Sequence, residues 1–180
     1  MAVLATHRVI TLDAPFDPQP LLGALSADFA VAPHTGANSL TDAIRAAAGD
    51  TVAIGLCICD GNSWVLTLRD QAAAQEAAND MPSELAALDV CVLQNLILSP
   101  LLGISADALA TSNQVSYTVH EAEACERVRR GEAHVAFVLN PTSIEQVWRA
   151  AQSGVTMPQK STYFYPKLLT GLVINSLDDA

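Results

Sequence analysis

The chain has 180 residues, of which 51% are hydrophobic and 16% charged, and its formal net charge is -10. This length and composition predict one globular domain, residues 1–180, that is large enough to bury a core. The acidic balance argues against nucleic acid or an anionic membrane as a partner, since both require clustered Lys and Arg. No apolar run approaches the roughly 20 residues of a membrane helix, and we expect a cytoplasmic protein.

The cysteines lie mostly in apolar surroundings, without the dense, regular spacing of a secreted disulfide framework. We therefore predict reduced thiols. Cys57 and Cys59 share one face of a predicted strand, but no second pair and no nearby His completes a metal set. Buried small apolar residues are the favoured interpretation, and no metal is expected.

The first fifty residues read as short elements separated by turns. Residues 8–12 predict a strand, which a proline-rich loop ends before a helix that begins after Pro20. A short strand is expected at 29–32. A second helix begins at Ser39 or Thr41 and ends at Gly49.

Residues 51–68 have the pattern of a β-hairpin, because two apolar runs flank the turn sequence Asp-Gly-Asn-Ser at 60–63. Residues 70–84 are weakly helical and form the best candidate for an exposed connection. A buried helix is predicted at 85–98, stopped by Pro100, and a short helix follows near Ala106.

The last third alternates strand (115–119), helix (121–130), strand (133–139) and helix (142–152). This rhythm predicts a right-handed crossover with parallel strands. A last strand is expected at 172–174, before a polar tail. The predicted fold class is α/β (or α+β), with a mixed β-sheet flanked by helices, a C-terminal βαβα crossover unit and an internal β-hairpin.

Residues 157–167 concentrate cations and hydroxyls in an acidic chain, and their two prolines predict a rigid, non-helical segment. We expect it to return to the corner at Asn140, where the unpaired N–H groups that begin the next helix favour an anion. The candidate ligand-binding residues here are Asn140, Thr142, Ser143, Lys160, Ser161, Thr162 and Lys167.

An alternative is that Thr142 or Ser143 only caps the helix, with a capping box from Glu145 or Gln146, and that Lys160 pairs with a surface carboxylate. Capping is the favoured reading for the corner, whereas both readings stay open for the lysine segment.

Two further candidates stand at the start of the first strand. Arg8 can bind a carboxylate or phosphate through two nitrogens, and His7 brings a titratable ring beside it. The alternative, which we favour, is a strand entry with polar side chains that reach solvent.

The strings Leu-Asn-Pro-Thr-Ser at 139–143 and Met-Pro-Gln-Lys-Ser-Thr at 157–162 resemble the C-terminal end of the family called domain of unknown function 1015. Family members are considerably longer, and their N-terminal half, similar to the ParB and sulfiredoxin superfamily, is absent here. The family tends to have His at Gln94 and an acidic residue at His120. The chain thus looks like the C-terminal half alone, naturally split or truncated.

The resemblance and the candidate residues give two functional hypotheses. In the first, the domain binds a small phosphorylated or carboxylated metabolite or nucleotide as one half of a small-molecule enzyme, whose other half is a separate N-terminal-half chain. The alternative is a non-catalytic interaction domain that pairs with that missing half or forms a homo-oligomer. Whether the chain catalyses a reaction, and with which cofactor, is left open.

Overall fold

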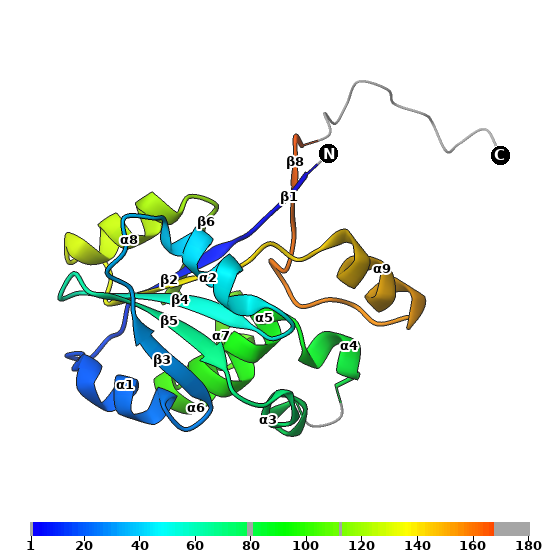
Figure 1. Ribbon diagram of the computed structural model, residues 1–180, viewed down its shortest axis with the longest axis horizontal. Helices are drawn as coiled ribbons and strands as arrows, with labels where there is room; N and C mark the ends of the chain where they lie inside the picture. Colours follow the sequence, from blue (N-terminus) through cyan, green and yellow to red (C-terminus); the bar gives the residue numbers. More distant parts are fainter. Residues whose placement is uncertain (1, 79–80, 112, 168–180) are drawn as a thin grey trace.

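The computed structural model describes residues 2–78, 81–111 and 113–167, in which a six-stranded sheet carries helices on both faces (Figure 1). The strands are β1 (Ala2–Leu4), β2 (His7–Ile10), β3 (Phe29–Pro33), β4 (Ala53–Ile58), β5 (Ser63–Leu68), β6 (Val115–Thr118), β7 (Val135–Val138) and β8 (Tyr163–Tyr165). The helices are α1 (Pro18–Leu25), α2 (Leu40–Ala48), α3 (Gln71–Ala77), α4 (Ser83–Ala86), α5 (Asp89–Val92), the π-helix η1 (Leu93–Leu98), α6 (Ser99–Leu102), α7 (Ala106–Thr111), α8 (Glu121–Arg129) and α9 (Ile144–Gln152).

The six strands lie in the order β3-β5-β4-β7-β2-β6, and all neighbouring strands pair antiparallel. The predicted hairpin is present as β4 and β5, with Cys57 opposite Ser63. Its turn is held by Asp60, whose carboxylate accepts hydrogen bonds from the main-chain N–H of Asn62 at 2.9 Å and from its side chain at 2.8 Å. The α/β class with helices flanking a sheet is confirmed.

The predicted crossover is also present as β6, α8 and β7, but its two strands are not neighbours. Both pair with β2, which lies between them, so that Arg8 stands opposite Tyr117 on one side and Phe137 on the other. The strands of the crossover run in the same direction only across this intervening strand. Because β2 lies more than 100 residues away in the sequence, no local pattern of the last third indicates it.

Side chains alternate between the two faces of the sheet and build two cores. Ile10 and Phe137 belong to the larger core, which α1, α5 and η1 cover, whereas Val9 and Val138 belong to the smaller core beneath α2 and α8 (Figure 1). Gly55 of β4 lies under α2, where an added Cβ would approach the Leu40 side chain to 2.7 Å. This glycine therefore permits the close packing of α2 on the sheet.

The helical run at 89–102 differs from its prediction, because it passes through Pro100 instead of stopping there. Pro100 stands in the first turn of α6, where a missing N–H costs little. The run ends at Gly103, which has a left-handed φ of 68° and lets the N–H of Ile104 bond to the carbonyl of Leu98 at 2.8 Å.

Three other regions remain: the connection at 70–84, the expected strand near the C-terminus, and a strand pair that was not predicted. The connection expected at 70–84 contains α3, whose Ala74 is buried. The expected strand at 172–174 and the polar tail lie outside the described residues. A short ribbon of β1 and β8, which the sequence pattern did not indicate, rises away from the main sheet (Figure 1).

None of the described helices combines the length and the apolar character needed to cross a bilayer.

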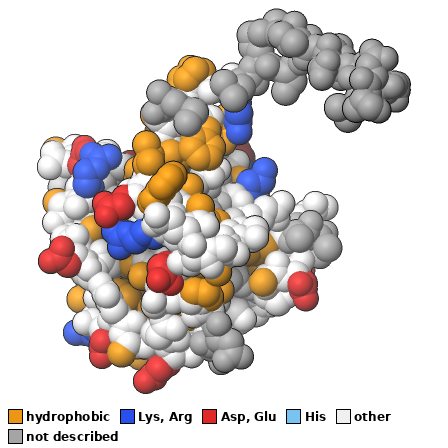
Figure 2. All heavy atoms as spheres, turned by 90° about the vertical axis from the view of Figure 1, so that its right-hand side faces the viewer, with side chains coloured by type: hydrophobic (Ala, Val, Ile, Leu, Met, Phe, Trp, Pro, Cys, Tyr) orange, Lys and Arg blue, Asp and Glu red, His pale blue; other side chains and the backbone are white. Residues whose placement is uncertain are grey.

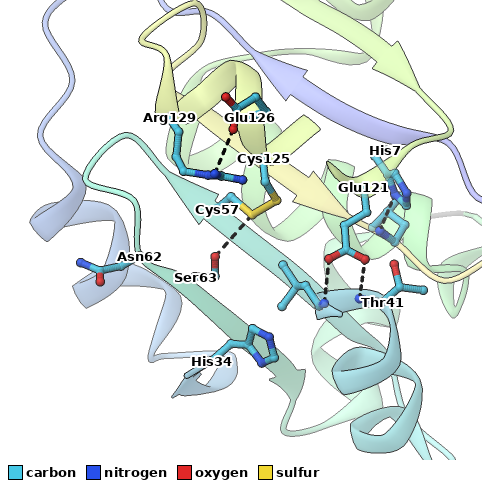
Figure 3. The surroundings of a disulfide bond; sticks show 12 residues. His7, His34, Thr41, Cys57, Asn62, Ser63, Glu121, Cys125, Glu126 and Arg129 are labelled. Carbon is cyan, nitrogen blue, oxygen red and sulfur yellow. Dashed lines mark hydrogen bonds and ion pairs between the residues drawn. A yellow bond between two sulfur atoms is a disulfide. The ribbon is translucent and has the colours of Figure 1, made fainter. Parts of the chain in front are cut away.

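A disulfide joins Cys57 of β4 to Cys125 of α8, so the prediction of reduced thiols is wrong for this pair (Figure 3). Cys57 faces the smaller core, and α8 packs on the same face. The two residues are 68 positions apart, which is why their spacing gave no signal. Cys59 is exposed beyond the end of β4, and Cys91 is buried; both are free thiols.

A carboxylate from α8 closes the start of α2 (Figure 3). Glu121 accepts hydrogen bonds from the N–H groups of Leu40 at 2.7 Å and Thr41 at 3.0 Å, while Ser39 accepts that of Asp42 at 3.1 Å. Helix starts leave such N–H groups without partners, so this contact fixes α2 against α8. Burial of Glu121 opposes ionisation, but these hydrogen bonds outweigh it and lower its pKa.

His7 lies beside Glu121 on the same face, 3% exposed (Figure 3). Its Nδ1 accepts a hydrogen bond from the N–H of Leu139 at 3.2 Å, a role that only an unprotonated nitrogen can fill. Burial lowers its pKa from 6.5 to about 4, with Glu121 opposing the shift. His7 is therefore a neutral, structural residue at neutral pH.

Reducing the disulfide should destabilise the protein. For a loop of 68 residues, the lost constraint on the unfolded chain amounts to about 4 kcal/mol. The Cys125→Ser variant should show the same loss, and reductant should not destabilise it further. Thermal unfolding with and without dithiothreitol tests this, with Cys59→Ala as the control that stays sensitive to reductant. An unchanged midpoint of the reduced protein would contradict the expectation.

His7 should make stability depend on pH. Its pKa is lower in the folded protein, so the unfolded chain binds the proton first, and stability is lost as pH falls from 6.5 towards 4. Between pH 7.5 and 4.5, the stability of the protein relative to His7→Asn should fall by about 2.5 kcal/mol. Asn keeps an acceptor for the Leu139 N–H but does not titrate. Urea unfolding at a series of pH values measures this difference.

The comparison with His7→Asn is needed because burial raises the pKa of Asp89 to about 6. That carboxyl favours the folded state as pH falls through 6, opposite in sign to His7. The Asp89 carboxyl contributes equally to the stability of the protein and of His7→Asn, so its effect cancels in the difference between them. His34→Asn is the control for loss of an imidazole at a half-buried position. Parallel stability curves for the protein and His7→Asn would rule out the assigned role.

Candidate functional site

The lysine segment returns to the Asn140 corner, as its position in the sequence suggested. The hydroxyl of Thr142 donates a hydrogen bond to the carbonyl of Ser161 at 2.8 Å. The hydroxyl of Ser161 in turn donates to the carbonyl of Pro158 at 2.6 Å. Both side chains are buried. These hydroxyls thus fasten residues 158–161 to the start of α9. A ligand-binding role for them, or for the half-buried Thr162 that follows, stays a prediction.

The helix start at the corner is closed by its own side chains. The Ser143 hydroxyl accepts a hydrogen bond from the main-chain N–H of Gln146 at 3.1 Å, and the Gln146 side chain accepts one from the main-chain N–H of Ser143 at 2.8 Å. This is the capping box of the alternative interpretation. The main-chain N–H of Asn140 donates a hydrogen bond to the Asp89 carboxylate at 3.3 Å, and its side-chain amide donates to the carbonyl of Ala53 at 3.2 Å. The corner therefore positions the chain and leaves its polar groups occupied.

Lys160 lies over a hollow of about 340 Å³ that we call the Lys160 hollow; its walls include Thr6, Tyr117 and Tyr163. The Lys160 ammonium is 6.0 Å from the centre of the Tyr117 ring. The hydroxyl oxygen of Thr6 is buried and has no hydrogen-bond partner among the residues described. The Lys167 ammonium is 4.3 Å from the centre of the Tyr163 ring, and Lys167 itself does not line the hollow.

Arg8 lies beneath this segment and joins it to the sheet. Its guanidinium donates to the carbonyls of Thr6 and, at 3.2 Å, of Lys160, and lies 5.5 Å from the centre of the Tyr117 ring. The residue is only 4% exposed, and no acidic side chain of the described part forms an ion pair with it. Burial lowers the Arg8 pKa to about 10, so it stays charged at neutral pH.

Arg8 also lines a cavity of about 230 Å³, the Arg8 cavity. Gln94 and Asn95 of η1 supply amides to its wall. The Gln94 Nε2 donates to the carbonyl of Ile104 at 2.9 Å, whereas its Oε1 is buried and has no partner in the described part of the chain. The apolar walls are formed by Met81, Val90, Leu98, Ala106, Leu109 and Pro158.

The thiol of Cys91 is in the same wall. Burial raises its pKa to about 12, although Arg8 acts in the opposite direction. Cys91 is thus an uncharged thiol at neutral pH and a poor nucleophile. The Arg8 cavity combines a cation, amides and apolar walls, which suits binding of an anion more than chemistry on it.

The structure therefore brings Arg8 together with Lys160 and separates His7 from both. Arg8 and Thr6 are two positions apart on an extended chain and point to one face, whereas His7 points to the other. The amides of Gln94 and Asn95 were not predicted as site residues. Their signal was present in the sequence, since they are the only polar pair in the apolar run at 90–98.

No protein-family model and no curated protein matches the chain. A solved free serine kinase in complex with AMP is similar at 14% identity with a TM-score of 0.48, over 89% of this chain and 52% of that one. A conserved hypothetical protein from Pyrococcus furiosus is similar at 13% identity with a TM-score of 0.47, over 89% of this chain and 54% of its own. The chain thus spans about half the length of these solved chains.

Proposed function

We propose that this chain binds a small anionic metabolite in the Arg8 cavity. The observation that carries the proposal is the buried Arg8 guanidinium, which lacks an acidic partner in the described residues. A buried charge without a countercharge costs several kcal/mol. An anion that enters the cavity offsets part of that cost. Lys160, above the same Tyr117 ring, adds positive potential nearby.

The cavity favours a certain kind of anion. A guanidinium binds carboxylate and phosphate groups through two parallel hydrogen bonds. The unpartnered Oε1 of Gln94 is an acceptor, so it favours a ligand with an N–H or O–H group beside its anionic group. The volume of about 230 Å³ is below the roughly 300–1,000 Å³ of pockets for drug-sized ligands. A nucleotide fits only if most of it lies outside the cavity.

A binding role without complete catalytic machinery agrees with these residues. Cys91 is uncharged, and the other polar groups that line the cavity are a guanidinium and amides, none of which transfers protons readily at neutral pH. We infer that the domain holds the substrate of a small-molecule enzyme and that another lobe or chain brings the reacting groups.

Thermal unfolding with a ligand panel tests the proposal. The panel contains inorganic phosphate, phosphoserine, lactate, AMP and ADP. A ligand at 100 times its Kd stabilises the folded state by about 2.7 kcal/mol, which raises Tm by roughly 5–10 °C for a domain of this size. Arg8→Gln should abolish the shift. Arg69→Gln is the matched control, since Arg69 also donates to a backbone carbonyl, that of Phe29 at 3.0 Å, but does not line the cavity.

A second variant keeps the test decisive if Arg8→Gln folds poorly. Gln94→Glu places a negative charge in the same cavity as Arg8, so it should weaken binding of every anion more than tenfold, as measured by calorimetric titration. The proposal fails if no anion of the panel shifts Tm, or if both variants respond as the unchanged protein does.

A further inference from the structure

The largest exposed apolar side chains of the described residues gather on one side of the molecule. On α9, Ile144 is 65% exposed and Trp148 64%, and Tyr165 of β8 is 57% exposed. Only Leu101, at 37%, belongs to the same class elsewhere in the described chain. Figure 2 shows hydrophobic side chains over the side that carries α9 and the ribbon. We call Ile144, Trp148 and Tyr165 the α9 patch.

Ile144 and Trp148 stand four residues apart, so they lie next to each other on one face of α9. The opposite face of the helix is anchored in the larger core through Ala150. Helix α9 is therefore apolar towards the protein and apolar again towards solvent. A helix that only covered a core would carry polar residues on its outer face.

The ribbon of β1 and β8, which carries Tyr165, also lacks support. In the described structure, β1 and β8 pair only with each other, and each strand has three residues. A two-stranded ribbon of this kind is marginally stable alone and needs a third strand or a packing surface. A partner seated on the α9 patch would supply that surface.

The charges on α9 indicate which partner fits. Glu145 and Arg149 form an ion pair at 2.9 Å one helical turn apart, next to Ile144 and Trp148. If a second α9 crosses antiparallel near Gln146, Ile144 of each copy meets Trp148 of the other. In this register Glu145 lies opposite Val147 of the other copy, and the long side chain of Arg149, two residues further along that helix, reaches back towards it. The apolar and the charged positions are thus self-complementary about one twofold axis.

Electrostatics over the whole molecule favour the same site. Each copy has a net charge of -10, so most of its surfaces repel a second copy. The outer face of α9 carries one acid and one base and is locally neutral. The exposed parts of the α9 patch amount to roughly 400 Å² per copy, if full side chains of this size span about 150–250 Å². When the patches of both copies and the polar residues around them are buried together, the buried area reaches the roughly 1,000 Å² of a specific interface.

We propose that two copies of this chain associate through the α9 patch, with the α9 helices antiparallel. The proposal is independent of anion binding, because the residues of the α9 patch line neither the Arg8 cavity nor the Lys160 hollow.

Sedimentation equilibrium over low-micromolar to millimolar concentrations tests the association. The unchanged chain should dimerise reversibly. Trp148→Ala should weaken the dimer by about 30-fold or more, as loss of a central aromatic residue does, while circular dichroism confirms that the exposed substitution leaves the fold intact. A monomer at every concentration, or a dimer that Trp148→Ala leaves unchanged, overturns the proposal.

A charge exchange tests the antiparallel arrangement. Arg149→Glu or Glu145→Arg alone brings like charges of the two copies close together and should weaken the dimer by about tenfold. The double variant E145R/R149E should restore it to within about threefold. Arg130→Glu is the matched control, since it breaks the exposed pair of Arg130 with Glu126 on α8, also at 2.9 Å, and should leave the dimer unchanged. Failure of the double variant to recover association would overturn this arrangement.

Discussion

The Arg8 guanidinium connects two parts of the chain that are far apart in the sequence. It donates to the carbonyl of Lys160, 152 residues later in the sequence, and so ties strand β2 to the segment that leads into β8. Both cavities described above lie against this contact, because Arg8 lines one and its neighbour Thr6 lines the other. A buried cation is costly, which is why the lack of an acidic partner for Arg8 among the described residues carries functional weight.

The same end of β2 is polar on both faces, with opposite consequences. On one face, His7 and Glu121 have hydrogen-bond partners, and they hold α2, α8 and the end of β7 together. On the other face, Thr6 and Gln94 each keep a buried oxygen without a partner in the described residues. Buried polar atoms in folded proteins are nearly all satisfied, so the two exceptions indicate where a ligand or water completes the structure.

Local features of the fold were predictable from the sequence, and distant pairings were not. The turn at 60–63 and the apolar runs around it indicated the β4–β5 hairpin, and capping residues indicated α2 and α9. No local pattern reveals that β2 enters the crossover, that Cys57 meets Cys125, or that Ala2–Leu4 pairs with Tyr163–Tyr165. Of the site, Arg8 and Lys160 were candidates because of their chemistry. The favoured interpretation of Arg8 and His7 as a strand entry that reaches solvent is wrong, because both side chains are buried. Gln94 and Asn95 were passed over, because an amide pair inside an apolar helix resembles a minor interruption of a core.

The strand order also has a consequence for how the protein is made. Strand β2 leaves the ribosome first among the six, yet both of its neighbours come from residues 115–138. Until those residues are synthesised, β4 has an unpaired edge where β7 will lie, while β3, β5 and β4 can already pair. Closing such a long loop is slow compared with forming hairpins. The nascent chain thus carries an open β edge through much of its synthesis, which makes this stage the one most exposed to aggregation.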